Sequence, residues 1–201
     1  SRKGKRAEDI PELRDYLVDT VLLFNHPNIK GILFEGAQGF YLTVDSKDYP
    51  WVTCSDVSLG SVISSGVSPK AIRNIYGVCK VYDTYVGNKI FEDKTSSDAQ
   101  LFDFIRKYGN EYGATTGRPR QISWLDLDEL TYSAIATDIT HLHISKVDIL
   151  EKLDVFRLYH QGYGDEGLVT FNTFSQMSEY VESALKASLG KTIEISYGRH
   201  P

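Results

Sequence analysis

The stretch His141-Leu142-His143-Ile144-Ser145-Lys146-Val147-Asp148 indicates the fold class. Its first five residues predict a short strand that delivers Lys146 to a loop. Helical patterns lie on both sides of it in the chain, over 125–139 and over 175–189. Gly190 ends the second helix, and a last strand is expected over 192–196. This alternation predicts an α/β protein with a largely parallel central sheet flanked by helices, in which ligands bind at the carboxyl ends of the strands.

The earlier part of the chain contributes further elements. A helix is expected to begin at Asp9 and Pro11 and to run to Phe24, where Asn25-His26-Pro27 ends it. Ile32-Leu33-Phe34 predicts a short buried strand. The remaining predictions are a helical stretch over 57–65, a turn at Pro69, a strand over 75–86 and a helix over 99–108. No repeat or linker interrupts residues 1–201, so they are expected to be part of a single domain.

The composition argues against several classes of function. A net charge of -5 over 201 residues argues against non-specific binding of nucleic acid, which needs a basic face. No apolar run approaches about 18 residues, so neither a membrane span nor a signal peptide is expected. Cys54 and Cys79 indicate neither a disulfide framework nor a zinc site and fit a reducing cytoplasm. The five histidines lack partners at the spacing of metal ligands, so no metal site is expected.

Small residues surround a glutamine in Glu35-Gly36-Ala37-Gln38-Gly39. They follow the expected strand directly, so the backbone can approach a ligand closely there. The amide of Gln38 both donates and accepts hydrogen bonds, which suits the O6 atom of a purine. The alternative is a tight turn with an exposed glutamine.

Two hydroxyls, a glycine and two guanidinium groups converge in Thr115-Thr116-Gly117-Arg118-Pro119-Arg120. Guanidinium groups match the geometry of carboxylates and phosphates, and each charge-assisted bond contributes about 1.5–3 kcal/mol. The loop therefore suits a small dianion. The alternative is a solvated basic loop that caps the next helix near Trp124.

Lys146 and Asp148 form a third candidate site, where a strand ends. The carboxylate of Asp148 can accept hydrogen bonds from the N1–H and the exocyclic amine of guanine together, while the stem of Lys146 lies over the base. Adenine lacks this pair of donors. The alternative is a surface lysine beside a helix N-cap aspartate, because this pair of residues is frequent by chance.

Together with Asp48-Tyr49-Pro50-Trp51-Val52-Thr53, these segments resemble the adenylosuccinate synthetase family in order and spacing. Fifteen residues separate Gln38 from Thr53, and 28 separate Arg118 from Lys146. The chain resembles the carboxyl-terminal part of the enzyme, because the family's glycine-rich phosphate loop and catalytic histidine have no counterpart in it. The fold is therefore expected to be incomplete without an amino-terminal phosphate-loop portion. The compact length is similar to the short archaeal and phage forms.

The resemblance implies roles for individual residues. Gln38 contacts the purine 6-oxygen and is the catalytic residue, since its hydrogen bond strengthens as that oxygen becomes charged. The residues implied to hold the purine nucleotide are Gln38, Thr53, Val86, Arg118 and, across a dimer interface, Lys3. Those implied to hold L-aspartate are Thr115, Thr116, Arg118 and Arg120. Those implied to hold the base of the nucleoside triphosphate are Lys146, Asp148, Ser196 and Gly198.

Besides Lys3, which stands where the family has an arginine, four positions depart from the family's pattern. Pro119 and Gln121 stand where basic residues are usual, and the proline makes the loop stiffer. Tyr85 stands where arginine is common, beside the ribose contact at Val86. Arg199 replaces the proline that usually closes the base pocket.

The resemblance implies a carbon–nitrogen ligase of the purine pathway. A nucleoside triphosphate, GTP or ATP, phosphorylates the 6-oxygen of IMP or, in phage members, of (d)GMP. The amine of L-aspartate then displaces phosphate to give adenylosuccinate or its 2-amino form. Mg²⁺ is the expected cofactor, with ligands in the part of the enzyme that this chain lacks. The expected assembly is a cytoplasmic homodimer with no nucleic-acid or membrane partner, and this chain alone is expected to be inactive. The alternative is a non-catalytic nucleotide-binding or dimerisation fragment.

Overall fold

A computed structural model describes residues 4–92, 97–161 and 167–199 of the chain. The chain divides into two compact units, Ser1–Arg73 and Asn74–Pro201. All the strands found in the described residues belong to the second unit. This unit therefore supplies the framework for most of the candidate residues.

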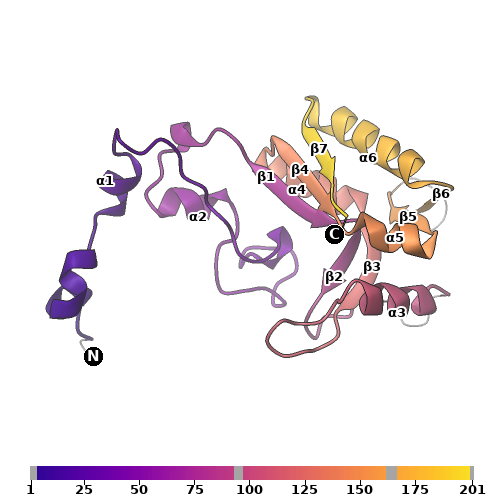
Figure 1. Ribbon diagram of the computed structural model, residues 1–201, viewed down its shortest axis with the longest axis horizontal. Helices are drawn as coiled ribbons and strands as arrows, with labels where there is room; N and C mark the ends of the chain where they lie inside the picture. The colour runs from indigo at the N-terminus through magenta and orange to yellow at the C-terminus, as the bar shows by residue number, and fades with distance from the viewer. Residues whose placement is uncertain (1–3, 93–96, 162–166, 200–201) are drawn as a thin grey trace. The chain divides into compact units, whose positions relative to one another are not determined.

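The second unit contains two sheets (Figure 1). The first consists of three parallel strands in the order β1-β4-β7, with β1 at Tyr76–Lys80, β4 at His141–Ser145 and β7 at Glu194–Tyr197. The second has the order β2-β3-β5-β6, with β2 at Tyr82–Tyr85, β3 at Gln121–Asp126, β5 at Phe156–Tyr159 and β6 at Leu168–Phe171. Its central pair β3–β5 is parallel, and its outer pairs are antiparallel. The predicted α/β class is confirmed, with a mixed sheet in addition to the parallel one.

The chain passes from one sheet to the other at Val81. Lys80 at the end of β1 pairs with Ser145, whereas Tyr82 at the start of β2 pairs with Trp124 of the second sheet. Val81 itself is buried, and its N–H donates to the carbonyl of Ser145 at 3.0 Å. The prediction of one strand over 75–86 was therefore wrong in this respect, because the segment forms two strands in two sheets.

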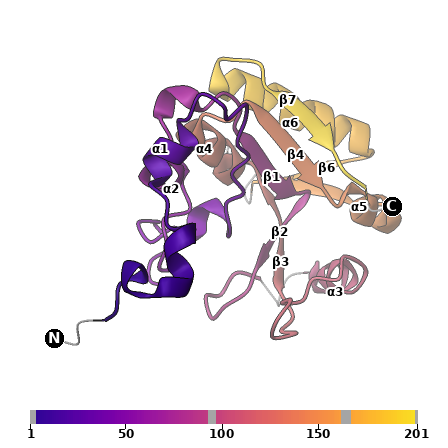
Figure 2. The same ribbon diagram turned by 60° about the vertical axis from the view of Figure 1, so that its left-hand side comes forward.

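Four helices of the second unit pack on these strands: α3 at Ala99–Tyr108, α4 at Leu127–Thr137, α5 at Val147–Leu153 and α6 at Phe174–Leu189. Figure 2 shows α6 alongside the strands of the parallel sheet. The hydroxyl of Tyr197 in β7 donates to the carboxylate of Glu182 in α6 at 3.1 Å. The side chain of Asp126 caps α4, and Gly190 ends α6 with a left-handed φ of 62°.

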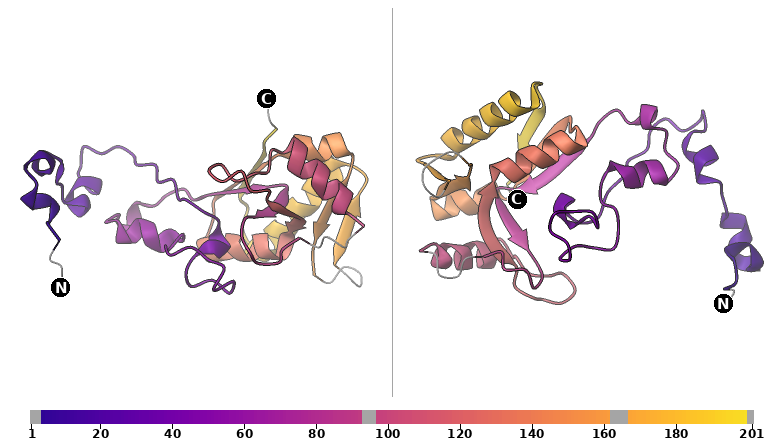
Figure 3. Two further views of the ribbon diagram at one scale, coloured as in Figure 1. Left: turned by 90° about the horizontal axis from the view of Figure 1, so that it is seen from below. Right: turned by 180° about the vertical axis from the view of Figure 1, so that it is seen from behind.

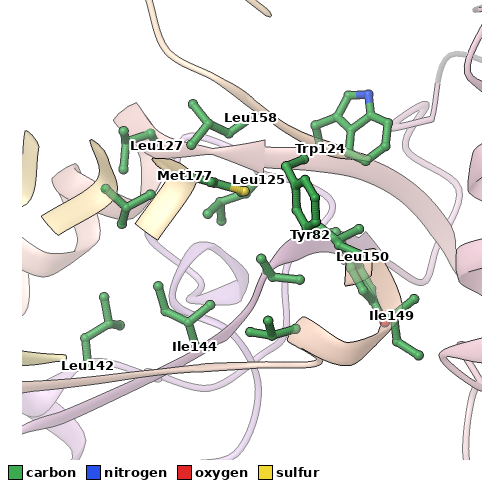
Figure 4. Close-up of a cluster of buried hydrophobic side chains, with 14 of the residues drawn as sticks. Tyr82, Trp124, Leu125, Leu127, Leu142, Ile144, Ile149, Leu150, Leu158 and Met177 are labelled. Carbon is green, nitrogen blue, oxygen red and sulfur yellow. The ribbon is translucent and has the colours of Figure 1, made fainter. Parts of the chain in front are cut away.

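The core of the second unit forms where these helices cover the strands (Figure 4). Along β4, Leu142 and Ile144 are buried while the residues between them are half-buried, which is the alternation of a strand with one core face. The largest fully buried side chains include Tyr82, Trp124, Leu125, Leu127, Leu150, Leu158, Met177 and Leu185. Burial of each such aliphatic side chain contributes about 1.5–3 kcal/mol, so this core fixes the strand ends on which the candidate loops stand.

The first unit has little regular structure. It holds two short helices, α1 at Thr20–Phe24 and α2 at Leu59–Ser64, and 3-10 turns at Ala7–Asp9, Pro11–Tyr16, Phe40–Leu42 and Pro69–Ala71. The amide of Asn25 at the end of α1 donates to the carbonyl of Gly66 after α2, at 2.9 Å. Among the described residues of this unit, only Val67 is buried.

Several predictions for the first unit were wrong. The helix expected from Asp9 to Phe24 is broken into two 3-10 turns and the short helix α1. The buried strand expected at Ile32-Leu33-Phe34 is absent from the described structure, and Leu33 is 87% exposed. An apolar periodic pattern needs a packed surface to cover it, and the described residues of this unit do not provide one. The predicted helix over 57–65 and the turn at Pro69 are confirmed.

In the second unit, the elements predicted over 99–108, 141–145 and 175–189 are confirmed, and the last strand lies at Glu194–Tyr197. The helix expected over 125–139 begins two residues later, because Leu125 and Asp126 still belong to β3. The sequence patterns did not indicate β3, α5, β5 or β6.

Candidate functional site

Three parallel strands end at one edge of the first sheet. Lys80 at the end of β1 pairs with Ser145 at the end of β4, and Ile144 pairs with Tyr197 at the end of β7. Carboxyl edges of parallel strands are the usual ligand-binding edges of α/β proteins. Three of the four residues predicted to hold the base of a nucleoside triphosphate lie on the segments that leave β4 and β7 at this edge, namely Lys146, Asp148 and Gly198. The fourth, Ser196, lies within β7.

Lys146 leaves β4 in a left-handed backbone conformation with φ 66°. Its ammonium donates to the carbonyl oxygen of Gly109, the C-cap of α3, at 2.8 Å. A cation at this place satisfies one of the open carbonyls of a helix end. Val147 is fully buried, and Asp148 lies half-buried in the first turn of α5. Lys146 therefore has a fixed partner, which argues against the alternative of a surface lysine.

Gly198 joins the end of β7 to this loop. Its N–H donates to the carbonyl of Ile144 at 2.8 Å, and its carbonyl accepts from the N–H of Val147 at 3.1 Å. A β-carbon on Gly198 would lie 2.6 Å from Nε2 of His143, so the histidine ring would have to shift to admit a side chain there. The other ring nitrogen of His143 forms a hydrogen bond with the hydroxyl of Ser196 at 2.9 Å. The structure thus brings Gly198 to the loop of Lys146 and Asp148, and Ser196 to His143 of β4.

The predicted aspartate-binding residues lie on a narrow loop between α3 and β3 (Figure 3). The stem of the loop is a short antiparallel bridge between Tyr112 and Pro119. Across it, the N–H of Gly113 donates to the carbonyl of Arg118 at 2.8 Å. Thr115, Thr116 and Arg118 are exposed at the tip. The side chains that would meet a ligand therefore face solvent on a loop whose ends are held by hydrogen bonds.

Arg120 differs from the rest of this loop because it contacts a buried carboxylate. Glu111, which is 2% exposed, lies 3.4 Å from the guanidinium of Arg120. The same carboxylate accepts from the ammonium of Lys80 at 2.7 Å and from the hydroxyl of Tyr82 at 2.9 Å. Sequence reasoning missed Glu111, because no motif contains it and its partners come from distant positions in the chain.

Charge in this cluster, formed by Lys80, Tyr82, Glu111 and Arg120, is predominantly positive. Burial lowers the pKa of the Lys80 ammonium, and the carboxylate of Glu111 opposes that change. The cationic groups of Arg120 and Lys146 also act on Lys80 and lower its pKa further. Two cations, Lys80 and Arg120, therefore contact one buried carboxylate at the edge where the parallel strands end, and the charge of Lys146 acts on Lys80 there. This balance of charge suits the approach of an anion.

Val86 lies just after β2 and is exposed. Gln121 holds the loop that follows it. The side-chain oxygen of Gln121 accepts from the N–H of Phe91 at 2.9 Å and of Glu92 at 3.1 Å. Its side-chain nitrogen donates to the carbonyls of Gly87 and Lys89 at 3.2 and 2.7 Å. The backbone beside the predicted ribose contact is thus fixed by the residue that follows Arg120.

Two predicted nucleotide-binding residues lie in the first unit. Gln38 is exposed and has a φ of 74°, which is uncommon for a residue with a side chain. The N–H of Thr53 donates to the carbonyl of Leu42 at 2.8 Å, and its hydroxyl lies 3.4 Å from that of Ser55. Lys3, the third predicted residue of this part of the chain, lies outside the described residues.

No group of three or more His, Cys, Asp or Glu side chains within the described ranges is arranged to hold a metal ion. In those same ranges, no helix has the length and apolar character to cross a membrane.

The sequence profile of the adenylosuccinate synthetase family matches residues 5–188. The chain belongs to the adenylosuccinate synthetase family. Curated adenylosuccinate synthetases of Streptococcus gordonii and Staphylococcus epidermidis are each 39% identical to it, over 150 and 153 residues. These matches cover 73% of the chain and 34% of each relative, so the chain spans about a third of the length of these relatives. The solved structure of fully ligated adenylosuccinate synthetase from Plasmodium falciparum matches with a TM-score of 0.74 and 27% identity, covering 90% of this chain and 51% of that one.

Two of the positions where this member of the adenylosuccinate synthetase family departs from the expected pattern have specific partners. Gln121 ties the loop after Val86 to the start of β3, as described above. Arg199 forms a two-bond ion pair with Glu151 of α5, with distances of 2.5 and 2.8 Å. This pair lowers the pKa of Glu151, because the guanidinium stabilises its carboxylate. Arg199 thus connects the segment after β7 to α5 on the far side of Gly198.

Proposed function

We propose that the protein acts in a carbon–nitrogen ligase reaction that joins L-aspartate to C6 of a purine monophosphate at the expense of a nucleoside triphosphate. Membership of the adenylosuccinate synthetase family supports the reaction class. The observation that supports it at this site is the link between two loops. Lys146 of the proposed base loop is bonded to Gly109, and Glu111, two residues later, contacts Arg120 of the proposed aspartate loop.

The proposed chemistry has two steps. The terminal phosphoryl group moves from the triphosphate to the purine 6-oxygen, and Gln38 donates a hydrogen bond to that oxygen as it gains charge. The aspartate nitrogen then forms a bond to C6 as the C6–O bond breaks, so that phosphate leaves and the amine loses a proton. Arg118 and Arg120 hold the aspartate carboxylates, because guanidinium groups bind carboxylates through paired hydrogen bonds. Thr53 holds the phosphate of the monophosphate.

The proposed phosphoryl donor is GTP. The carboxylate of Asp148 accepts from the N1–H and the exocyclic amine of guanine, and Lys146, Ser196 and Gly198 surround the base. For the acceptor nucleotide, IMP is the proposed substrate and (d)GMP is the alternative of the phage branch.

The proposal includes a homodimer in which Lys3 reaches the nucleotide of the other subunit. Its support is the large apolar surface of the first unit, where large side chains such as Tyr16, Leu22 and Leu33 are 79%, 71% and 87% exposed. Exposed apolar surface of this kind marks an interaction face. Sedimentation velocity of the purified protein tests this, and a monomer at micromolar concentration would contradict it.

Turnover assays test the ligase proposal. The full-length protein is incubated with L-aspartate and Mg²⁺ in the four combinations of IMP or dGMP with GTP or ATP, and products are identified by mass spectrometry. Formation of adenylosuccinate from IMP and GTP is the expected result. Product from dGMP would instead assign the phage-type substrate. Nucleotide binding without any product would support the non-catalytic alternative.

A further inference from the structure

We infer that Glu111 is a positioning residue that holds Arg120 for aspartate and links the aspartate loop to the carboxyl edge of the parallel sheet. This inference rests on the proposed function of the loop. Glu111 itself is not expected to touch a substrate, because its side chain is 3% exposed.

The backbone and the side chain of Glu111 both hold Arg120. The carbonyl of Glu111 accepts from the N–H of Arg120 at 3.0 Å, and its carboxylate lies 3.4 Å from the Arg120 guanidinium. The Arg120 side chain remains 31% exposed, so part of the guanidinium can still meet a ligand. Nε of Arg120 is buried without a hydrogen-bond partner, which indicates that the side chain is held by its contact with Glu111 rather than by a complete set of bonds.

A second contact holds the same stretch of backbone from the side of α3. Arg106 donates through Nε to the carbonyl of Arg120 at 2.8 Å and forms an ion pair with Glu92. The peptide units on both sides of the Arg120 side chain are therefore fixed. The remaining freedom lies in the side chain itself, which Glu111 directs.

The other partners of Glu111 connect this arginine to the sheet edge. Lys80 is the last residue of β1, and Tyr82 is the first residue of β2. Both donate to the carboxylate, at 2.7 and 2.9 Å. The one carboxylate therefore joins the end of the parallel sheet, the start of the second sheet and the stem of the loop.

Charge explains why a neutral residue cannot replace Glu111. Without its carboxylate, Lys80 and Arg120 would be like charges close together in a half-buried place, with Lys146 as a third. Of the two cations that contact Glu111, Arg120 is more exposed than Lys80, so its guanidinium would turn toward solvent. Stability alone does not account for the arrangement, because buried ion pairs contribute little compared with apolar side chains of the same size.

Two roles of Glu111 predict opposite results. If Glu111 only competed with aspartate for the guanidinium, its removal would release Arg120 and lower the aspartate KM. If Glu111 positions Arg120, its removal raises that KM. Glu111→Gln distinguishes the two, because glutamine keeps the size and one acceptor oxygen but removes the charge.

The test is a set of double-mutant cycles in the full-length protein, with KM for aspartate and for GTP measured separately. Glu111→Gln is expected to raise the aspartate KM about tenfold and to change the GTP KM less than about threefold. In an Arg120→Gln background, Glu111→Gln should add nothing further. In an Arg118→Gln background the two effects should multiply, because Arg118 lies at the exposed loop tip.

Asp98→Asn is the matched control. Asp98 is also buried and paired with an arginine, Arg157, at 2.6 Å, but it belongs to no proposed site. It should lower the melting temperature and leave the aspartate KM unchanged, which separates positioning from general loss of stability. If Glu111→Gln does not fold, Glu111→Asp is measured instead. That variant keeps the charge but draws it back from Arg120, and it should raise the aspartate KM by a smaller factor.

Three results would overturn the inference. An unchanged or lower aspartate KM in Glu111→Gln excludes positioning. Effects that multiply in the Arg120→Gln background show that Glu111 does not act through Arg120, and they leave the proposed function intact. An unaltered aspartate KM in Arg120→Gln alone overturns both the inference and the proposed role of the loop.

Discussion

The ammonium of Lys146 donates to the carbonyl oxygen of Gly109 at 2.8 Å, although the two residues lie 37 positions apart in the chain. This bond joins the loop after β4 to the end of α3. Because the lysine stem is held in this way, it forms a fixed surface beside Asp148 in the first turn of α5. The carboxylate of Asp148 then has a defined place from which to meet a base.

Asp148→Ala is therefore expected to weaken the use of GTP about 10- to 100-fold, which matches the loss of one or two charge-assisted bonds. The use of ATP should change little, because adenine does not present the same pair of donors. The measurement is kcat/KM for each donor. Lys152→Gln on the same helix is the control, since the side chain of Lys152 is exposed and belongs to no proposed site. A wild-type protein that already prefers ATP would contradict the assignment of the pocket.

Gly198→Ala should destabilise the protein because the new methyl group would lie 2.6 Å from Nε2 of His143. A forced shift of this kind costs about 1–3 kcal/mol in the free energy of unfolding. In a His143→Ala background the cost should largely disappear, since the obstructing ring is gone. Gly31→Ala is the control, with no atom within 4 Å of the new carbon. Urea unfolding measures the wild type, the two single variants, the double variant and the control, and an equal cost of Gly198→Ala in both backgrounds would refute the steric explanation.

The elements that could be predicted from the sequence are those long enough to show a repeated spacing of apolar residues. In α6, Met177, Val181 and Leu185 recur at helical spacing and are all buried. The strand β5 has only four residues and two buried side chains, Phe156 and Leu158, which is too few to show a period. Short strands of this kind take their structure from neighbours in the sheet.

The residues of the candidate site also fall into two groups, those that could be predicted from the sequence and those that could not. Motif residues such as Arg118 could be proposed because the residues next to them in the sequence are also suited to binding an anion. Glu111 could not, because its partners Lys80 and Tyr82 lie 31 and 29 positions away. Arg199 was a departure from a pattern until the structure placed Glu151 beside it. Long-range pairs between charged residues leave no periodic signal in one sequence.

The carboxyl of Asp83 in β2 should make stability depend on pH. Burial raises its pKa to about 7, with the carboxylates of Glu129 and Asp126 acting in the same direction and the ammonium of Lys80 in the opposite one. The folded state then holds this proton more tightly than the unfolded state. The contribution to stability is complete below the unfolded pKa of 3.8 and is lost as the pH rises through about 7.

Asp83→Asn removes this dependence and keeps an acceptor oxygen for the N–H of Asp126, which lies 2.9 Å from the carboxylate. We expect the variant to be more stable than the wild type by about 1–2 kcal/mol at a pH of about 8, and equally stable at a pH of about 4. Chemical unfolding at a series of pH values measures the difference. Asp154→Asn is the control, because Asp154 is exposed and its left-handed φ of 53° suits asparagine. A constant difference across this range would show that Asp83 does not titrate as described.

The left-handed backbone of Gln38 offers a way to separate its chemical role from its conformation. A residue with a side chain at a φ of 74° costs about 1 kcal/mol relative to glycine, and such positions concentrate at functional sites. Gln38→Gly removes both the amide and the strain, whereas Gln38→Ala removes the amide and keeps the strain. If the amide donates to the purine 6-oxygen, both variants should lose at least about tenfold in kcat, with a smaller change in the nucleotide KM.

The two variants should differ in stability, with Gln38→Gly more stable than Gln38→Ala because only glycine relieves the strain, and with Gln38→Ala similar to the wild type. Steady-state kinetics with the monophosphate as the varied substrate, together with urea unfolding, measures both properties. Gly31→Ala, which lies outside this segment and has no atom within 4 Å of the added carbon, is the control and should retain kcat. A full kcat in Gln38→Gly would show that this position serves the turn alone, because the amide would then be dispensable for the step at the 6-oxygen.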